Sequence, residues 1–116
     1  MVARILVVDD DPLIRSLLGW HLRAQGYRVD EAETADIALE RLAASRFDLL
    51  ITDVHLPGSS GLWLLGEVRA RWTDLPVILV TGEFPAGDAH RAADAVLLKP
   101  FRVVDLLRHV DRVLRG

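Results

Sequence analysis

The chain has 116 residues, of which 51% are hydrophobic and 27% charged, and its formal net charge is −3. These values indicate one globular domain over residues 1–116 and not a disordered chain, and no apolar run approaches the roughly 20 residues needed to cross a membrane. The net charge gives no electrostatic case for nucleic-acid binding by this domain. Because it lacks both a signal peptide and cysteine, we expect a cytoplasmic protein without disulfides or thiolate metal sites.

The first half of the chain predicts two strands that alternate with two helices. Residues 4–8 are a short apolar run, typical of a strand buried on both faces, and Asp11 then caps a helix over about residues 12–25. Residues 28–32 are polar and alternating, as in an edge strand, and a second helix follows over residues 34–45. On the apolar face of the first helix, which we expect to point inward, lie Leu13, Leu17, Trp20 and Ala24, with Ile14 and Leu18 beside them.

The second half predicts three more strands and two clear helices. Pro85 and Gly87 break the segment before the last strand and leave only about residues 88–93 for a further helix. This fourth helix is therefore shortened. The strands are expected at residues 49–53, 76–80 and 95–98, and the clear helices at residues 61–71 and 103–114.

The alternation of strands and helices predicts a parallel sheet that is covered by helices on both faces. The carboxyl ends of all five strands lie on one side of such a sheet, which we call its carboxyl edge. Open α/β sheets place their ligand sites there. The polar side chains at these ends are Asp9, Asp10, Asp53, Thr81 and Lys99.

Three carboxylates at this edge repel one another. A pair about 4 Å apart costs roughly 4 kcal/mol at an effective dielectric constant near 20. Lys99 supplies one positive charge, which does not balance three acids, so we expect a bound Mg²⁺. An acidic pocket with a metal, an ammonium and a hydroxyl is suited to phosphoryl transfer, in which one carboxylate attacks phosphorus.

Four segments in this order resemble the response-regulator receiver domain of two-component signalling. They are residues 7–12, 53–58, 80–82 and 98–101. The resemblance extends over essentially the whole chain. It implies a flavodoxin-like α/β fold with a five-stranded parallel sheet in the order 2-1-3-4-5, and a cis peptide bond between Lys99 and Pro100.

The resemblance also implies how the acidic pocket works. Asp53 would accept a phosphoryl group from a histidine kinase or a phosphotransfer protein. Asp9 and Asp10 would bind Mg²⁺ together with Asp53 and the backbone carbonyl of His55. The domain would thus catalyse only its own phosphorylation and dephosphorylation, and its downstream protein target is not readable from the sequence.

Four other side chains have implied roles. Thr81 would hydrogen-bond the phosphoryl group through its hydroxyl, and Lys99 would pair with the same group. His55 and Glu83 each lie two positions after a site residue, and in this family such residues tune dephosphorylation.

Two features depart from the family pattern. Receivers usually carry an aromatic residue three positions before the lysine, where this chain has Val96, which is too short and stiff to swing between two poses. The stretch between Thr81 and Lys99 is also shorter by about one helical turn. We therefore expect the signal to leave through a non-standard output surface, the loop of residues 82–87.

Two other functions stay open from the sequence alone. The spacing of Asp9 and Asp11 is that of phosphatases of the haloacid-dehalogenase type, with Asp9 as nucleophile and Asp11 as acid and base. Against this, the chain has no cap domain and the pattern leaves Asp53 without a role. The other alternative is an interaction module that keeps the receiver fold and works without phosphorylation.

Overall fold

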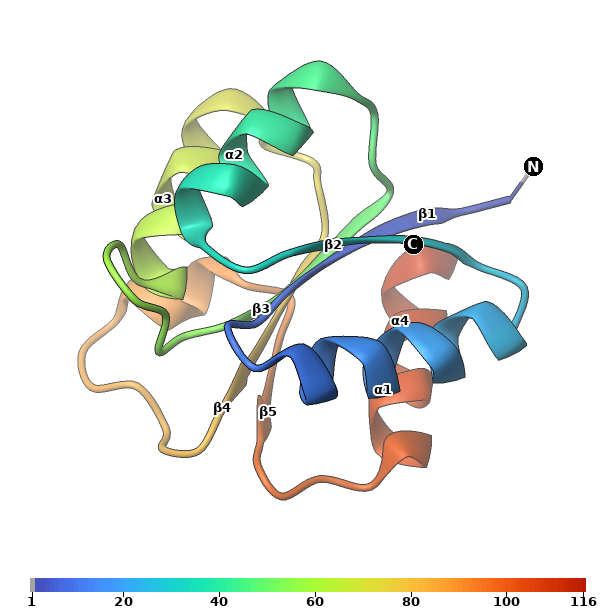
Figure 1. The fold of residues 1–116 in the computed structure, drawn as a ribbon. Helices are drawn as coiled ribbons and strands as arrows, with labels where there is room; N and C mark the ends of the chain where they lie inside the picture. The colour runs from blue at the N-terminus through green and yellow to red at the C-terminus, as the bar shows by residue number, and fades with distance from the viewer. Residues whose placement is uncertain (1) are drawn as a thin grey trace.

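The computed structural model describes residues 2–116, which form one parallel five-stranded sheet between two layers of helices (Figure 1). The strands are β1 (Arg4–Val8), β2 (Arg28–Ala32), β3 (Leu49–Asp53), β4 (Val77–Thr81) and β5 (Ala95–Leu98). Their order is β2-β1-β3-β4-β5, and every neighbouring pair is parallel. The flavodoxin-like order is thereby confirmed, with the polar strand β2 at an edge.

Each face of the sheet has its own pair of helices. The helices are α1 (Pro12–Ala24), α2 (Ala35–Ala44), α3 (Gly61–Arg71) and α4 (Val103–Arg115). Helices α2 and α3 pack on one face, and α1 and α4 pack on the other, as Figure 1 shows. None of the helices in residues 2–116 is long and apolar enough to cross a membrane.

The core of the protein is split by the sheet into two layers. Successive side chains of a strand point to opposite faces. In β1, Leu6 and Val8 therefore pack toward α2 and α3, while Ile5 and Val7 pack toward α1 and α4. All four side chains are buried, which explains why this strand is an uninterrupted apolar run.

Three helices begin at polar caps, of which the cap at Asp11 is the one predicted above. Asp11 accepts a hydrogen bond from the backbone N–H of Leu13, with 2.9 Å between the nitrogen and Oδ1. Thr34 caps α2 and Ser60 caps α3 in the same way, each at 3.1 Å. Such caps satisfy backbone donors that have no partner within the helix.

The predicted inward face of α1 is wrong. Leu13, Leu17 and Trp20 are 79%, 53% and 66% exposed, whereas Leu18 and Leu22 are buried against the sheet. The helix has apolar residues on two sides, and the sheet covers the side that carries Leu18 and Leu22. The other side remains an exposed apolar stripe.

The shortened fourth helix is reduced to a single 3₁₀ turn, η1 (Ala89–Ala92). Strand β4 begins at Val77 instead of Pro76. Strand β5 is only half-buried, because it is the edge strand next to β4. The peptide bond between Lys99 and Pro100 is cis, as expected.

Helix α3 begins directly against the backbone of β3. The backbone N–H of Gly61 donates to the carbonyl oxygen of Val54 at 2.9 Å. A Cβ added to Gly61 would lie 2.1 Å from the carbonyl oxygen of Asp53, far inside van der Waals contact. Only glycine therefore allows α3 to start so close to Asp53.

We predict that Gly61→Ala lowers the free energy of unfolding by roughly 3 kcal/mol, because the new methyl group forces α3 away from β3. The matched control is Gly66→Ala in the same helix, where a Cβ would meet nothing within 4 Å. That substitution should raise stability by up to about 1 kcal/mol, since alanine favours helix. Urea unfolding of both variants measures the difference, and equal effects would contradict the close contact.

Candidate functional site

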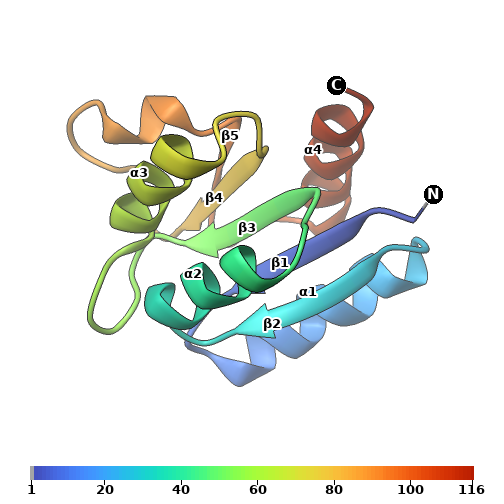
Figure 2. The same ribbon diagram turned by 90° about the horizontal axis from the view of Figure 1, so that it is seen from above.

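Three carboxylates gather at the carboxyl edge of the sheet. Asp53 is the last residue of β3, and Asp9 and Asp10 directly follow β1. Each of the three offers a carboxylate oxygen, and these oxygens all lie within 4.8 Å of one another. Asp9 is 3% and Asp53 7% exposed, while Asp10 is exposed to solvent. The cluster predicted from the strand ends is thus present, with one member reachable from solvent. Figure 2 shows the arrowheads of β2 and β3 at this same edge.

Lys99 joins the two buried acids. Its Nζ lies 2.9 Å from Oδ2 of Asp53 and 3.2 Å from Oδ2 of Asp9. Lys99 follows β5, so the sheet brings together side chains that are 46 and 90 residues apart in the chain. One ammonium faces three carboxylates, and the negative charge of the cluster is only partly balanced.

Burial and charge shift two pKa values in this cluster. Burial raises the pKa of the Asp9 carboxyl above its usual value, and the hydrogen bond from the backbone of Asp11 and the charge of Lys99 only partly oppose this. For Lys99, burial acts to lower the pKa, but the hydrogen bond to Asp53 and the charges of both acids outweigh it and raise the pKa. Lys99 therefore stays an ammonium, while Asp9 resists ionisation.

Backbone groups hold the carboxylates in place. The N–H of His55 donates to Oδ1 of Asp53 at 3.1 Å, and the N–H of Asp11 donates to Oδ1 of Asp9 at 2.9 Å. Each carboxylate thus has one oxygen on a backbone donor and the other on Lys99. Their orientation is set by the turns that follow β3 and β1.

Arg15 is a site neighbour that the sequence reading missed. Its Nη1 donates to the backbone carbonyl oxygen of Asp9 at 2.6 Å, and its Nε lies 3.5 Å from Glu31 in β2. The signal in the sequence was a basic residue in the first turn of the helix that begins at the acidic edge.

Thr81 ends β4 at the same edge, but its hydroxyl is engaged elsewhere. Oγ1 of Thr81 donates to the backbone carbonyl oxygen of Glu83 at 2.9 Å and accepts from the N–H of Glu83 at 3.4 Å. Thr81 is fully buried. The side chains of His55 and Glu83 are exposed, and within residues 2–116 neither forms an ion pair.

The donor set fits a small divalent cation. Mg²⁺ prefers oxygen ligands and usually keeps several waters, so it needs few protein groups. Asp10 is exposed and receives no hydrogen bond from another side chain in the part of the chain that the structure describes. Its charge, with the surplus on Asp9 and Asp53, is what a divalent cation would balance.

The fold and this edge together define a class of protein. It is an α/β protein of flavodoxin-like order whose ligand edge carries an acidic cluster beside a lysine. The family model of the response regulator receiver domain matches residues 5–111. The chain therefore belongs to this family, whose members are the phosphoryl-accepting domains of two-component response regulators.

Curated relatives agree with this family. The response regulator protein FleR of Pseudomonas aeruginosa is 38% identical over 123 residues, which cover 100% of this chain and 25% of FleR. The regulatory protein VanR of Enterococcus faecium is 37% identical over 119 residues, covering 99% of this chain and 51% of VanR. The chain thus spans between a quarter and about half of the length of these relatives.

Solved structures of similar chains show the same fold. The response regulator TrrA of Thermotoga maritima, in complex with Mg²⁺ and BeF, has a TM-score of 0.92 and 38% identity, and the match covers 97% of this chain and 99% of TrrA. A second structure shows TrrA in complex with the histidine kinase ThkA, with a TM-score of 0.91 and the same coverage.

We predict that Asp9→Asn stabilises the metal-free protein at pH 7, raising the midpoint of thermal unfolding by a few degrees. The pKa of Asp9 is raised in the folded state, so ionisation of this carboxyl disfavours folding as the pH rises through that pKa. The gain should vanish below the ordinary pKa of 3.8, where the carboxyl is protonated in both states.

The control is Asp74→Asn, an exposed acid outside the cluster, which should change stability little at either pH. Thermal unfolding followed by circular dichroism in the presence of a chelator measures both variants. A lower midpoint for Asp9→Asn at pH 7 would show that the ion pair with Lys99 outweighs the burial of the charge.

Proposed function

We propose that Asp53 accepts a phosphoryl group from a histidine kinase or a phosphotransfer protein in the cytoplasm, with Mg²⁺ at the acidic cluster. One observation carries this proposal. Asp53 ends the central strand with Lys99 Nζ at 2.9 Å from one oxygen and the His55 N–H at 3.1 Å from the other. A carboxylate oriented in this way, beside a cation, is ready to attack an electrophilic phosphorus.

The transfer forms one bond and breaks one. A carboxylate oxygen of Asp53 bonds to the phosphorus of a phosphohistidine, the phosphorus–nitrogen bond breaks, and the imidazole keeps the bonding pair and takes up a proton. The product is an acyl phosphate on Asp53. The ammonium of Lys99 stays close enough to pair with the transferred oxygens, and its raised pKa keeps it charged.

The other two acids are better suited to holding the metal. Asp10 is exposed, and Asp9 offers a carboxylate oxygen within 4.8 Å of those of Asp10 and Asp53. We assign both to Mg²⁺, with Asp53 and the backbone carbonyl of His55 completing the protein ligands. When bound, Mg²⁺ would neutralise charge on the phosphoryl oxygens.

His55 follows Asp53 by two residues in the sequence, and Glu83 follows Thr81 by two. Both side chains are exposed beside the site. We assign them to control of dephosphorylation, since exposed polar groups there can guide or exclude the water that hydrolyses the acyl phosphate. Substitution of either should change how fast the phosphorylated form decays without changing how much phosphate is accepted.

The output surface that we propose is the loop of residues 82–87. Val96 is half-buried and packs against the core, so it offers no side chain that can swing outward. Few hydrogen bonds hold the loop in place. Within residues 2–116, they are the two between Glu83 and the Thr81 hydroxyl. A hydroxyl has one proton to donate. If Thr81 donates to a phosphoryl oxygen, Glu83 loses that bond and the loop is released.

We predict that incubation with acetyl phosphate and Mg²⁺ adds one phosphoryl group to the wild-type chain and none to Asp53→Asn, as measured by intact mass. The exposed control Asp74→Asn should accept the group like wild type. A phosphate adduct that survives Asp53→Asn would overturn the assignment of the acceptor.

We predict that Thr81→Val, which removes the hydroxyl but keeps the volume, frees the loop without phosphorylation. The ¹H–¹⁵N heteronuclear Overhauser effects of residues 82–87 should fall in this variant, and also in wild type with Mg²⁺ and beryllofluoride. Thr81→Ser keeps the hydroxyl and should behave like wild type. Unchanged values in the loop, together with shifts in β5 and α4 on beryllofluoride addition, would place the output elsewhere.

A further inference from the structure

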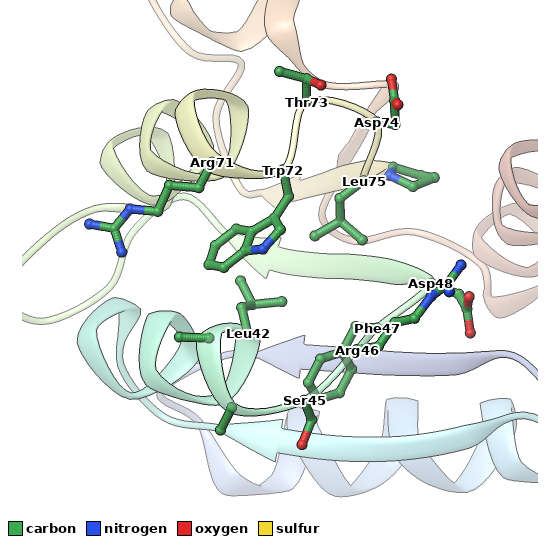
Figure 3. Close-up of a pocket in the computed structure, with 13 residues that line it drawn as sticks. Leu42, Ser45, Arg46, Phe47, Asp48, Arg71, Trp72, Thr73, Asp74 and Leu75 are labelled. Carbon is green, nitrogen blue, oxygen red and sulfur yellow. The ribbon is translucent and has the colours of Figure 1, made fainter.

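Two adjoining cavities lie at the end of the sheet opposite to Asp53. The larger is about 750 Å³ and lies between the connections α2–β3 and α3–β4 (Figure 3). The smaller is about 410 Å³ and lies at the amino ends of β1 and β2. Arg46 and Asp48 line both, so the two cavities are neighbours along the α2–β3 connection.

The larger cavity has a mixed lining, in which polar residues alternate with a few large apolar side chains. In Figure 3, Trp72 and Leu75 come from the α3–β4 connection, and Leu42 and Phe47 come from the end of α2 and the segment after it. Leu42 and Phe47 are buried and form the floor, while Trp72 and Leu75 are half-buried. A volume of this size and an aromatic lining are typical of sites for small molecules with a flat apolar group.

The smaller cavity is lined by three guanidinium groups, those of Arg4, Arg28 and Arg46, with one carboxylate, Asp48. Asp48 is already engaged, because it accepts the backbone N–H of Arg4 at 2.8 Å. Within residues 2–116, Arg28 and Arg46 form no ion pair.

Arg4 is fixed in place and still has an unfilled donor. Its Nη2 pairs with Asp30 at 2.5 Å, and its guanidinium lies over the ring of Phe47, 4.6 Å from the centroid. Its Nε is buried with no hydrogen-bond partner among the described residues. The positive charge that remains without an ion pair here, within residues 2–116, is that of Arg28 and Arg46.

We infer that this edge binds a small molecule that combines a flat apolar group with a phosphate. The flat group fits between Trp72 and Phe47, and the phosphate meets Arg46 and Arg28 where the two cavities join. Guanidinium groups match the oxygen geometry of phosphate and offer paired donors to it. The site is distinct from the acidic edge, which would repel such an anion, and it does not depend on phosphorylation of Asp53.

The test uses adenosine 5′-monophosphate as the probe, with adenosine and inorganic phosphate alongside it, in ¹H–¹⁵N spectra of the full chain. Saturable shifts from the monophosphate should fall on residues 42–48 and 71–76. Adenosine should bind about tenfold more weakly, because it lacks the charged contact. Equal binding of adenosine and its monophosphate would refute a role for the arginines.

Two variants distinguish binding of the monophosphate at this site from nonspecific attraction of an anion to the protein. Arg46→Gln should weaken binding of the monophosphate about tenfold. Arg108→Gln is the matched control, since Arg108 is an exposed arginine of α4 that forms no ion pair within residues 2–116. It should bind like wild type. The proposal fails if both variants weaken binding equally, if the shifts fall on the acidic edge, or if no saturable shift occurs.

Discussion

The contact between the Lys99 ammonium and the carboxylates of Asp53 and Asp9 is the interaction on which the functional edge depends. It joins the ends of β1, β3 and β5, which are far apart in the chain and are brought together only by the parallel order of the sheet. It also leaves the cluster short of positive charge, because one ammonium faces three acids. That deficit makes the edge receptive to a divalent cation, which would in turn offset the negative charge of a phosphoryl group.

The two ends of the sheet carry different side chains. At the carboxyl end, the strands end at or just before acids, a threonine and a lysine. Helix α3 also begins there, with Gly61 close against the backbone of Asp53. At the amino end, the connections after α2 and α3 enclose a cavity with a mixed lining, next to Arg28 and Arg46, which form no ion pair within residues 2–116. Phosphoryl transfer and the proposed binding of a phosphate ester thus use opposite ends of the sheet and separate sets of side chains.

Much of this architecture could be predicted from the sequence because it follows from local patterns. Short apolar runs marked the strands, and topology alone then placed Asp9, Asp10, Asp53 and Lys99 together. The exposed stripe of α1 could not be predicted, because the helix has apolar residues on two sides and only the packed sheet selects one. Nor could the donation of the Thr81 hydroxyl to Glu83, since a local turn and a distant phosphoryl group compete for the same proton.

The most direct test is a crystal structure of the protein with Mg²⁺ and beryllofluoride. We expect beryllium bonded to a carboxylate oxygen of Asp53, Mg²⁺ bound by Asp9 and Asp10, and Lys99 paired with fluoride. We also expect that Oγ1 of Thr81 has left the carbonyl of Glu83. Beryllium on Asp9 would contradict Asp53 as the acceptor, and an occupied site in which Thr81 still donates to Glu83 would contradict release of the loop.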